Sequence, residues 1–175
     1  MKIEYELSKQ DYIDFNIYHA NNSEVVKKSL LVQRYVTPVI FLILPFLLGR
    51  VTEIPLWYWF TVFLVTAVLW VAFYPRYFMA VTMKRVSRMV DEGKNKDLLG
   101  KQSIIVDEEG FIRKSQNGEN RMNWSGVEKI VSAEKHFFIY VSSISAYVIP
   151  KSPFENESDK DRFFEFVSRM LDGKQ

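Results

Sequence analysis

Two long apolar stretches interrupt the mixed pattern of hydrophobic and polar residues along the chain. The second stretch runs from Ile54 to Tyr74, about 21 residues without a charged side chain, and aromatic residues crowd both of its ends. At ~1.5 Å per residue, a helix of this length spans ~31 Å, which matches the hydrocarbon thickness of a bilayer. Aromatic rings at both ends are typical of membrane-spanning helices. The pattern therefore predicts a transmembrane helix over about residues 54–74.

The first stretch is shorter and less regular. Tyr35–Gly49 has 15 uncharged residues, fewer than the ~20 that a spanning helix needs. Arg34 and Arg50 bracket it and can extend toward the headgroups, while Pro38 and Pro45 predict a kink. We predict a second spanning helix over about residues 35–49, with a bent or re-entrant segment as the alternative.

The connection between the two stretches, Arg50–Pro55, is short enough only for a tight antiparallel turn. The sequence therefore predicts a transmembrane helical hairpin over residues 34–78. The alternative is a buried helical hairpin inside a soluble domain. A domain of this size has too little other surface to cover two helices that are apolar on all faces.

The charge distribution predicts the orientation of this hairpin. The net charge is +2, and the positive excess lies in residues 34–100, which carry a net +4. Basic residues flank the hairpin, whereas Arg50 alone lies in its loop. By the positive-inside rule both termini are expected in the cytoplasm, in a protein that crosses the cell membrane twice. The flanking residues are Lys27, Lys28, Arg34, Arg76, Lys84, Arg85 and Arg88.

Residues 79–100 are expected to form a juxtamembrane helix and a linker, because no helix breaker occurs between Phe78 and Gly93. Lys84, Arg85 and Arg88 fall within two turns of this helix, close to the expected membrane surface. Each can gain about 1 kcal/mol against anionic headgroups. They are candidate membrane-surface contacts, and the alternative that we favour is that they serve only to fix the topology.

The first 33 residues are expected to form a cytoplasmic strand and helix. Lys2–Leu7 alternates polar and apolar residues, which predicts a half-buried strand. Ser8 and Asp11 fit a capping box that opens a helix, and Ser23 can cap the next helix.

Residues 101–175 predict a separate C-terminal domain of short strands and one helix. The closing helix is expected to begin at a capping box, Ser158–Asp161, and to end at Gly173. Its apolar face, including Phe163 and Val167, can cover an open antiparallel sheet. The fold class is therefore an α+β membrane protein with a pleckstrin-homology-like domain, and similar meander-plus-helix folds remain open. The expected strands are 102–107, 111–115, 119–124, 129–133, 136–141 and 146–149.

About fifty residues near the C-terminus resemble the YcxB-like family of bacterial membrane proteins. The resemblance implies a cytoplasmic domain akin to bacterial pleckstrin-homology-like domains, and it brings no functional residues with it. The opening Tyr5–Tyr12 segment and the central hairpin fit the same layout. The residues that carry the resemblance are Trp124, Val127–Ile130, Phe138–Tyr140, Ala146–Lys151, Phe154 and Phe163–Phe164.

Motifs for catalysis, metals or cofactors are absent from the sequence. It has no cysteine, and His19 and His136 are its two histidines, both expected to be structural. Asp107–Glu109 is expected to be a solvated turn, and Trp124 a core residue. Basic residues on the strands are scattered, so we expect no phosphoinositide site. We expect no enzymatic activity, no cofactor and no bound metal.

The sequence favours a membrane-anchored, non-enzymatic binding or scaffold protein. Its partners are expected to be the lipid bilayer and either another protein or a second copy of the chain. Nucleic acid is not expected, because the basic excess lies beside the apolar stretches. An alternative, by analogy alone, is immunity against membrane-active peptides. A membrane enzyme or transporter is disfavoured, since neither apolar stretch contains an ionisable residue.

Overall fold

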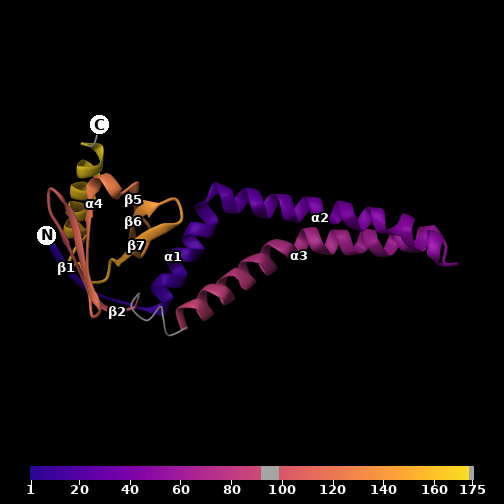
Figure 1. Cartoon of the computed structure of the whole chain (residues 1–175), viewed down its shortest axis with the longest axis horizontal. Coiled ribbons are helices and arrows are strands. Elements are labelled where there is room, and N and C mark those ends of the chain that lie inside the picture. Colours follow the sequence, from indigo (N-terminus) through magenta and orange to yellow (C-terminus); the bar gives the residue numbers. More distant parts are fainter. Residues whose placement is uncertain (92–98, 174–175) are drawn as a thin grey trace. The chain divides into compact units, whose positions relative to one another are not determined.

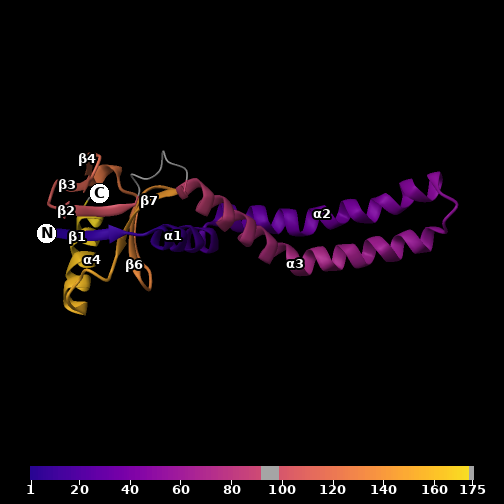
Figure 2. The same cartoon turned by 90° about the horizontal axis from the view of Figure 1, so that it is seen from below.

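The computed structural model describes residues 1–91 and 99–173. These residues form two compact units. The first, which we call the sheet domain, combines Met1–Ile17 with Val86–Gln175; the second, the hairpin unit, is Tyr18–Arg85. Figures 1 and 2 show two antiparallel sheets with a C-terminal helix, and a pair of long helices. The α+β class expected from the sequence is confirmed.

The N-terminal elements begin where the sequence places them. Strand β1 (Lys2–Leu7) alternates exposed and buried residues, as a strand with one face on a core must. Helix α1 (Lys9–Asn22) follows. Its capping box is confirmed, because the Ser8 backbone N–H donates to Asp11 Oδ2 (2.8 Å) and the Asp11 N–H donates to Ser8 Oγ (3.2 Å). These two bonds satisfy donors that a helix start leaves without partners.

The first sheet brings the N-terminus together with a distant segment. It is antiparallel, in the order β1-β2-β3-β4. Strand β1 pairs with β2 from Lys2 opposite Ile105 to Leu7 opposite Gly100. The segments 1–33 and 101–175, set apart in the sequence analysis by chain order, therefore share one sheet. The strands after β1 are β2 (Gly100–Val106), β3 (Gly110–Ser115) and β4 (Gly118–Asn123).

The turn between β2 and β3 leads into a glycine, Gly110, that β4 approaches too closely for any side chain. Asp107 Oδ1 accepts hydrogen bonds from the N–H groups of Glu109 (2.9 Å) and Gly110 (3.0 Å), which is the local bonding that favours Asp in turns. A Cβ atom at Gly110 would lie 2.0 Å from the carbonyl oxygen of Met122 on β4. The expected turn at Asp107–Glu109 is confirmed.

The second sheet is an antiparallel meander in the order β5-β6-β7. Helix α4 (Glu157–Asp172) follows it and contacts β5, and its residues Phe163 and Val167 are fully buried. The expected apolar face of the closing helix is thus confirmed. The strands are β5 (Lys129–Ser132), β6 (His136–Ser142) and β7 (Ser145–Pro150).

Most strand ends lie within one or two residues of the sequence prediction, whereas two boundaries differ because of a specific side-chain contact. Trp124 does not end the third predicted strand but begins a short 3-10 helix, η2 (Trp124–Gly126), where its indole N–H donates to the Asp107 carbonyl (2.9 Å). The capping box predicted at Ser158 is wrong. Asn156 caps α4 instead, because its side-chain oxygen accepts from the Asp159 N–H (2.9 Å), and Asn is among the strongest N-cap residues.

Aromatic rings fill the core of the sheet domain. Phe137 on β6 packs against Phe163 of α4, with 5.3 Å between ring centroids. Phe111 on β3 meets Tyr147 on β7 edge to face at 4.9 Å, a favourable arrangement for two rings. This second contact joins the two sheets directly.

The hairpin unit consists mainly of two long helices. Ser23 caps α2 (Glu24–Val51), as predicted, and α3 (Leu56–Asp91) follows after a tight connection. Helix α2 is continuous, with Pro38 and Pro45 inside it. The part of the predicted 79–100 segment beyond Asp91 falls mostly on residues 92–98, outside the described residues.

The two helices of the hairpin unit pack side by side (Figures 1 and 2). Phe46 of α2 meets Phe60 of α3 at 5.1 Å, and Phe41 meets Trp70 at 5.8 Å, both edge to face. At the turn, the Trp59 indole donates to Thr52 Oγ1 (3.1 Å). The antiparallel hairpin predicted from the sequence is therefore present, and both helices are long and apolar enough to cross a membrane.

Arg34 makes a specific contact between the two helices. Its Nε donates to the carbonyl oxygen of Val71 (2.9 Å). Four residues further on, Pro75 lacks the N–H group that would normally bond to that carbonyl. The guanidinium on α2 thus supplies a donor that α3 itself cannot provide.

Candidate functional site

The three basic residues that are candidates for membrane-surface contact, or only for fixing the topology, lie on the C-terminal part of α3. Lys84, Arg85 and Arg88 are exposed, and at 3.6 residues per turn they fall within about 100° of the helix circumference. Over the described ranges, no ion pair includes any of them. Helix α3 therefore presents three cations on one side.

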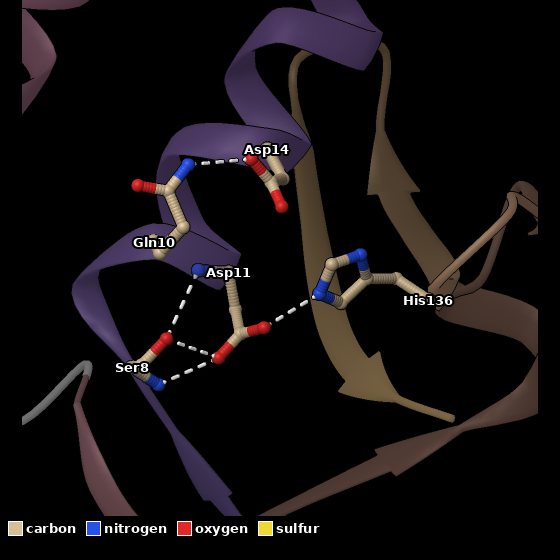
Figure 3. A network of polar contacts seen from close by, with 5 residues as sticks. All are labelled: Ser8, Gln10, Asp11, Asp14 and His136. Atoms are coloured by element: carbon tan, nitrogen blue, oxygen red, sulfur yellow. Dashed lines mark hydrogen bonds and ion pairs between the residues drawn. The ribbon is translucent and has the colours of Figure 1, made fainter. Parts of the chain in front are cut away.

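A buried histidine joins the start of α1 to the second sheet (Figure 3). His136, the first residue of β6, is 4% exposed, and its ring stacks on Phe138 at 5.7 Å. Its Nε2 lies 2.7 Å from Asp11 Oδ1. The other carboxylate oxygen, Oδ2, accepts from the backbone N–H and the hydroxyl of Ser8. One carboxylate thus serves both the helix cap and the histidine.

The environment of Asp11 favours its ionised form. Burial raises the pKa of Asp11, but the hydrogen bonds from His136 and Ser8 outweigh it, and the net pKa lies below its usual value. An ionised carboxylate only accepts hydrogen bonds, so Nε2 of His136 carries the hydrogen in this contact. His19, the other histidine, lies half-buried on α1.

A second polar group lies between the two sheets. The Tyr5 hydroxyl of β1 donates to Gln102 Oε1 of β2 (3.3 Å), and both residues are buried. Burial raises the pKa of Tyr5 to about 12, even though the nearby Arg113 guanidinium lowers it. Arg113 itself lies over the ring of Tyr147, 5.6 Å from the centroid. Its Nε is buried without a hydrogen-bond partner in the described part of the chain.

Metal-binding clusters are absent from the residues that the structure describes: no three His, Asp or Glu side chains gather there. Trp124 is buried and packs against Phe111, with 5.9 Å between ring centroids. Its position in the core agrees with the sequence prediction. Among the described residues of the sheet domain, the buried polar side chains of His136 and Gln102 belong to the Asp11–His136 contact and the Tyr5–Gln102–Arg113 group.

The sequence analysis missed both of these features. A local signal, the capping box, identified Ser8 and Asp11, but nothing in the sequence indicated that His136, 125 residues away, pairs with Asp11. From the sequence alone, Arg113 is one of several basic residues scattered over the predicted strands. Its contact with Tyr147 depends on how the two sheets pack, and periodicity within one strand carries no such information.

A comparison with protein families finds one match, over residues 106–167, to the family described as YcxB-like protein. The match runs from the end of β2 into α4. It confirms the resemblance seen in the sequence and covers neither β1 nor the hairpin unit. No curated protein and no solved structure gives a significant match.

Proposed function

Since the chain carries a YcxB-like domain over residues 106–167, we propose that it is a membrane-anchored, non-enzymatic binding or scaffold protein. Helices α2 and α3 span the cell membrane as a hairpin, and both termini lie in the cytoplasm. There the sheet domain binds a protein partner or the inner leaflet. The observation that carries this proposal is the exposure of the apolar side chains on both long helices.

In the most apolar 18-residue windows of α2 and α3, only 11% and 6% of the residues are buried. Side chains such as Phe46, Leu64 and Val68 are more than half exposed. In water, each Å² of such surface is unfavourable by about 25 cal/mol, whereas hydrocarbon removes this penalty. The low burial argues against a hairpin that forms the core of a soluble domain, and it supports a hairpin surrounded by lipid.

The orientation follows from the positive charges. Arg50, in the last turn of α2, is the one basic residue at the α2–α3 end of the hairpin, while seven basic residues flank the other end, which supports cytoplasmic termini. In this orientation Lys84, Arg85 and Arg88 lie on the cytoplasmic part of α3. We assign them mainly to fixing the topology, with additional attraction to anionic headgroups.

The order of strands and helix in the sheet domain also supports the proposal of a pleckstrin-homology-like fold. A four-stranded and a three-stranded antiparallel meander are followed by one C-terminal helix that covers the core. In this proposal the two long helices are inserted between the first and second strands of the domain. Fold alone assigns no ligand, so the binding role rests on the anchored domain and not on a recognised pocket.

Membrane insertion and orientation can be tested together with single-cysteine variants, because the natural chain has no cysteine. Glu53→Cys lies in the α2–α3 connection and Gln116→Cys in the β3–β4 turn, and both positions are exposed. We expect a membrane-impermeant thiol reagent applied to intact cells to label position 53 but not position 116. Permeabilised cells, in which both positions should react, provide the control.

The reverse labelling pattern would overturn the orientation. Release of the natural chain into the supernatant by alkaline carbonate would overturn the membrane anchor itself.

The binding role requires a separate test. A photo-crosslinking residue at Ile144, which is 74% exposed in the β6–β7 turn, should capture a defined protein or lipid in cells. Failure to capture either, there and at other exposed positions of the sheet domain, would contradict a scaffold or binding role.

A further inference from the structure

A pocket of about 210 Å³ lies between the two sheets, beside the start of α1. Its floor consists of buried side chains from both sheets, including Leu7, Gln102 and Val148. Ser145 at its rim is exposed, so the pocket is accessible from solvent. This volume is below the ~300–1,000 Å³ that is usual for pockets that bind drug-sized ligands. The pocket therefore suits a small molecule and is too small for a peptide or a nucleotide.

The walls of this pocket combine one cation with apolar and aromatic surface. Among the described residues that line it, Arg113 alone is charged. The rings of Tyr5, Tyr12 and Tyr147 contribute flat surfaces. Tyr5 is protonated at neutral pH, since tyrosine ordinarily titrates near 10 and burial raises the pKa of Tyr5 further, to about 12. The pocket thus carries one positive charge, and no lining residue carries a negative charge.

Arg113 has unused hydrogen-bonding capacity. No ion pair over residues 1–91 and 99–173 includes it, and its buried Nε lacks a partner in the same residues. A buried donor without a partner is energetically unfavourable. The guanidinium contacts the Tyr147 ring at 5.6 Å, an interaction that permits small displacements. A ligand that draws the guanidinium toward the pocket can give this N–H group an acceptor.

We infer that this pocket binds a small monocarboxylate, whose acid group pairs with Arg113 and whose apolar body packs on the tyrosine rings. A carboxylate matches the planar fork of a guanidinium with two parallel hydrogen bonds. A phosphate dianion would be only half neutralised by the single cation. This inference does not depend on membrane anchoring, because every residue that it uses belongs to the sheet domain.

Sodium benzoate is a suitable probe, because it combines one carboxylate with a flat ring of about the right size. We expect it to bind the full chain in detergent micelles, measured by titration calorimetry and by ligand-observed NMR. Arg113→Gln should weaken binding by about 10-fold or more, since it removes a charge-assisted hydrogen bond. Benzamide has the same shape without the charge. It should bind the natural chain no more tightly than benzoate binds the Arg113→Gln variant.

Lys114→Gln is the matched control. Lys114 is the next residue on β3, so its side chain points to the opposite face of the strand, where it pairs with Glu119 at 2.9 Å. This variant removes the same charge from the molecule without changing the pocket. We expect its affinity for benzoate to equal that of the natural chain. An equal loss in both variants would indicate a general charge effect and would overturn the inference.

A second variant covers the case in which Arg113→Gln fails to fold. Ala146→Leu adds side-chain volume at a half-buried position of the pocket wall and retains Arg113. It should abolish benzoate binding while circular dichroism shows an intact fold. Absence of benzoate binding to the natural chain, binding undiminished in folded Arg113→Gln or Ala146→Leu, or inorganic phosphate competing as strongly as benzoate would each overturn the inference.

Discussion

Asp11 shows how one side chain connects separate parts of the sheet domain. Its Oδ2 caps the first turn of α1 through Ser8, and its Oδ1 contacts His136 of β6. The ring of Phe15, one turn further along α1, packs edge to face on Phe138 at 5.2 Å. The polar contact and this apolar contact therefore fix the same helix against the same strand.

We predict that Asp11→Asn lowers the free energy of unfolding by about 1.5–3 kcal/mol at neutral pH, because it weakens hydrogen bonds made by a charged group. We expect a loss near the lower end of this energy range, because the Asp11 side chain is partly exposed and water screens its charge. Urea denaturation of the full chain in micelles measures the change. Asp14→Asn is the control: among the described residues, the Asp14 carboxylate accepts a hydrogen bond from the Gln10 side chain at the surface (2.7 Å), and the change should stay within about 0.5 kcal/mol.

The stability contributed by Asp11 should also depend on pH. Its pKa in the folded state lies below the ordinary pKa of an aspartate carboxyl, so the contribution is complete above that ordinary pKa. It is then lost as the pH falls through the lower, folded-state pKa. The difference in stability between the natural chain and Asp11→Asn should therefore shrink in acid. A difference that is constant from neutral to acid pH would contradict the ionised state assigned to Asp11.

At the scale of elements, the contact between α2 and α3 depends on a proline. Pro75 deprives the Val71 carbonyl of its helical partner, and Arg34 supplies the missing donor from the other helix. Nearby, the Trp70 indole donates to the Gln33 carbonyl (3.3 Å), and the Tyr74 hydroxyl bonds to the Gln33 side chain. These polar contacts hold α2 and α3 in one register along an otherwise apolar interface.

A double-mutant cycle tests this explanation. Arg34→Met should destabilise the hairpin by about 0.6 kcal/mol, and by no more than about 1.7 kcal/mol, the mean and the maximum for hydrogen bonds between membrane helices. Pro75→Ala restores an N–H group for the Val71 carbonyl, so Arg34→Met should have a smaller effect in the Pro75→Ala background. Unfolding of the full chain by denaturing detergent provides the readout. Additive effects of the two substitutions would show that Arg34 does not compensate for the proline.

Local signals predicted most of the elements but not all of their boundaries. The alternation of polar and apolar residues predicted β1, and the capping box of Ser8 and Asp11 predicted the start of α1. At α4, Asn156 and Ser158 are both acceptable N-caps two residues apart, so sequence alone could not choose between them, and Asn156 serves. Trp124 leaves the predicted strand because its indole bonds to the Asp107 carbonyl, a contact that propensity does not contain.

At the scale of the whole molecule, the sheet domain is discontinuous in sequence. Its residues precede and follow the hairpin unit, and β1 completes the first sheet by pairing with β2. Pairing between strands so distant, like the contacts of Asp11 with His136 and of Arg113 with Tyr147, leaves no local pattern in the sequence. These features were therefore beyond prediction, although each strand taking part was predicted.

We predict that the sheet domain folds without the hairpin if β1 is retained. A variant in which a flexible Gly/Ser linker replaces residues 18–85 should be soluble without detergent and should unfold in one cooperative transition, followed by circular dichroism. The comparison variant begins at residue 99 and lacks both β1 and α1. It leaves the edge of β2 unpaired, and we expect it to aggregate. Equal solubility and stability of the two variants would show that β1 and α1 are dispensable.

The discontinuity of the sheet domain also determines when the domain can fold during synthesis. Tyr5 and Gln102 are 97 residues apart, so at about 5–20 residues per second the ribosome makes β2 roughly 5–20 s after β1. Both long helices are synthesised within that interval. The domain can therefore close only after the hairpin exists, and a nascent chain that stalls before β2 leaves Ile3, Tyr5 and Leu7 uncovered for chaperones and proteases to recognise.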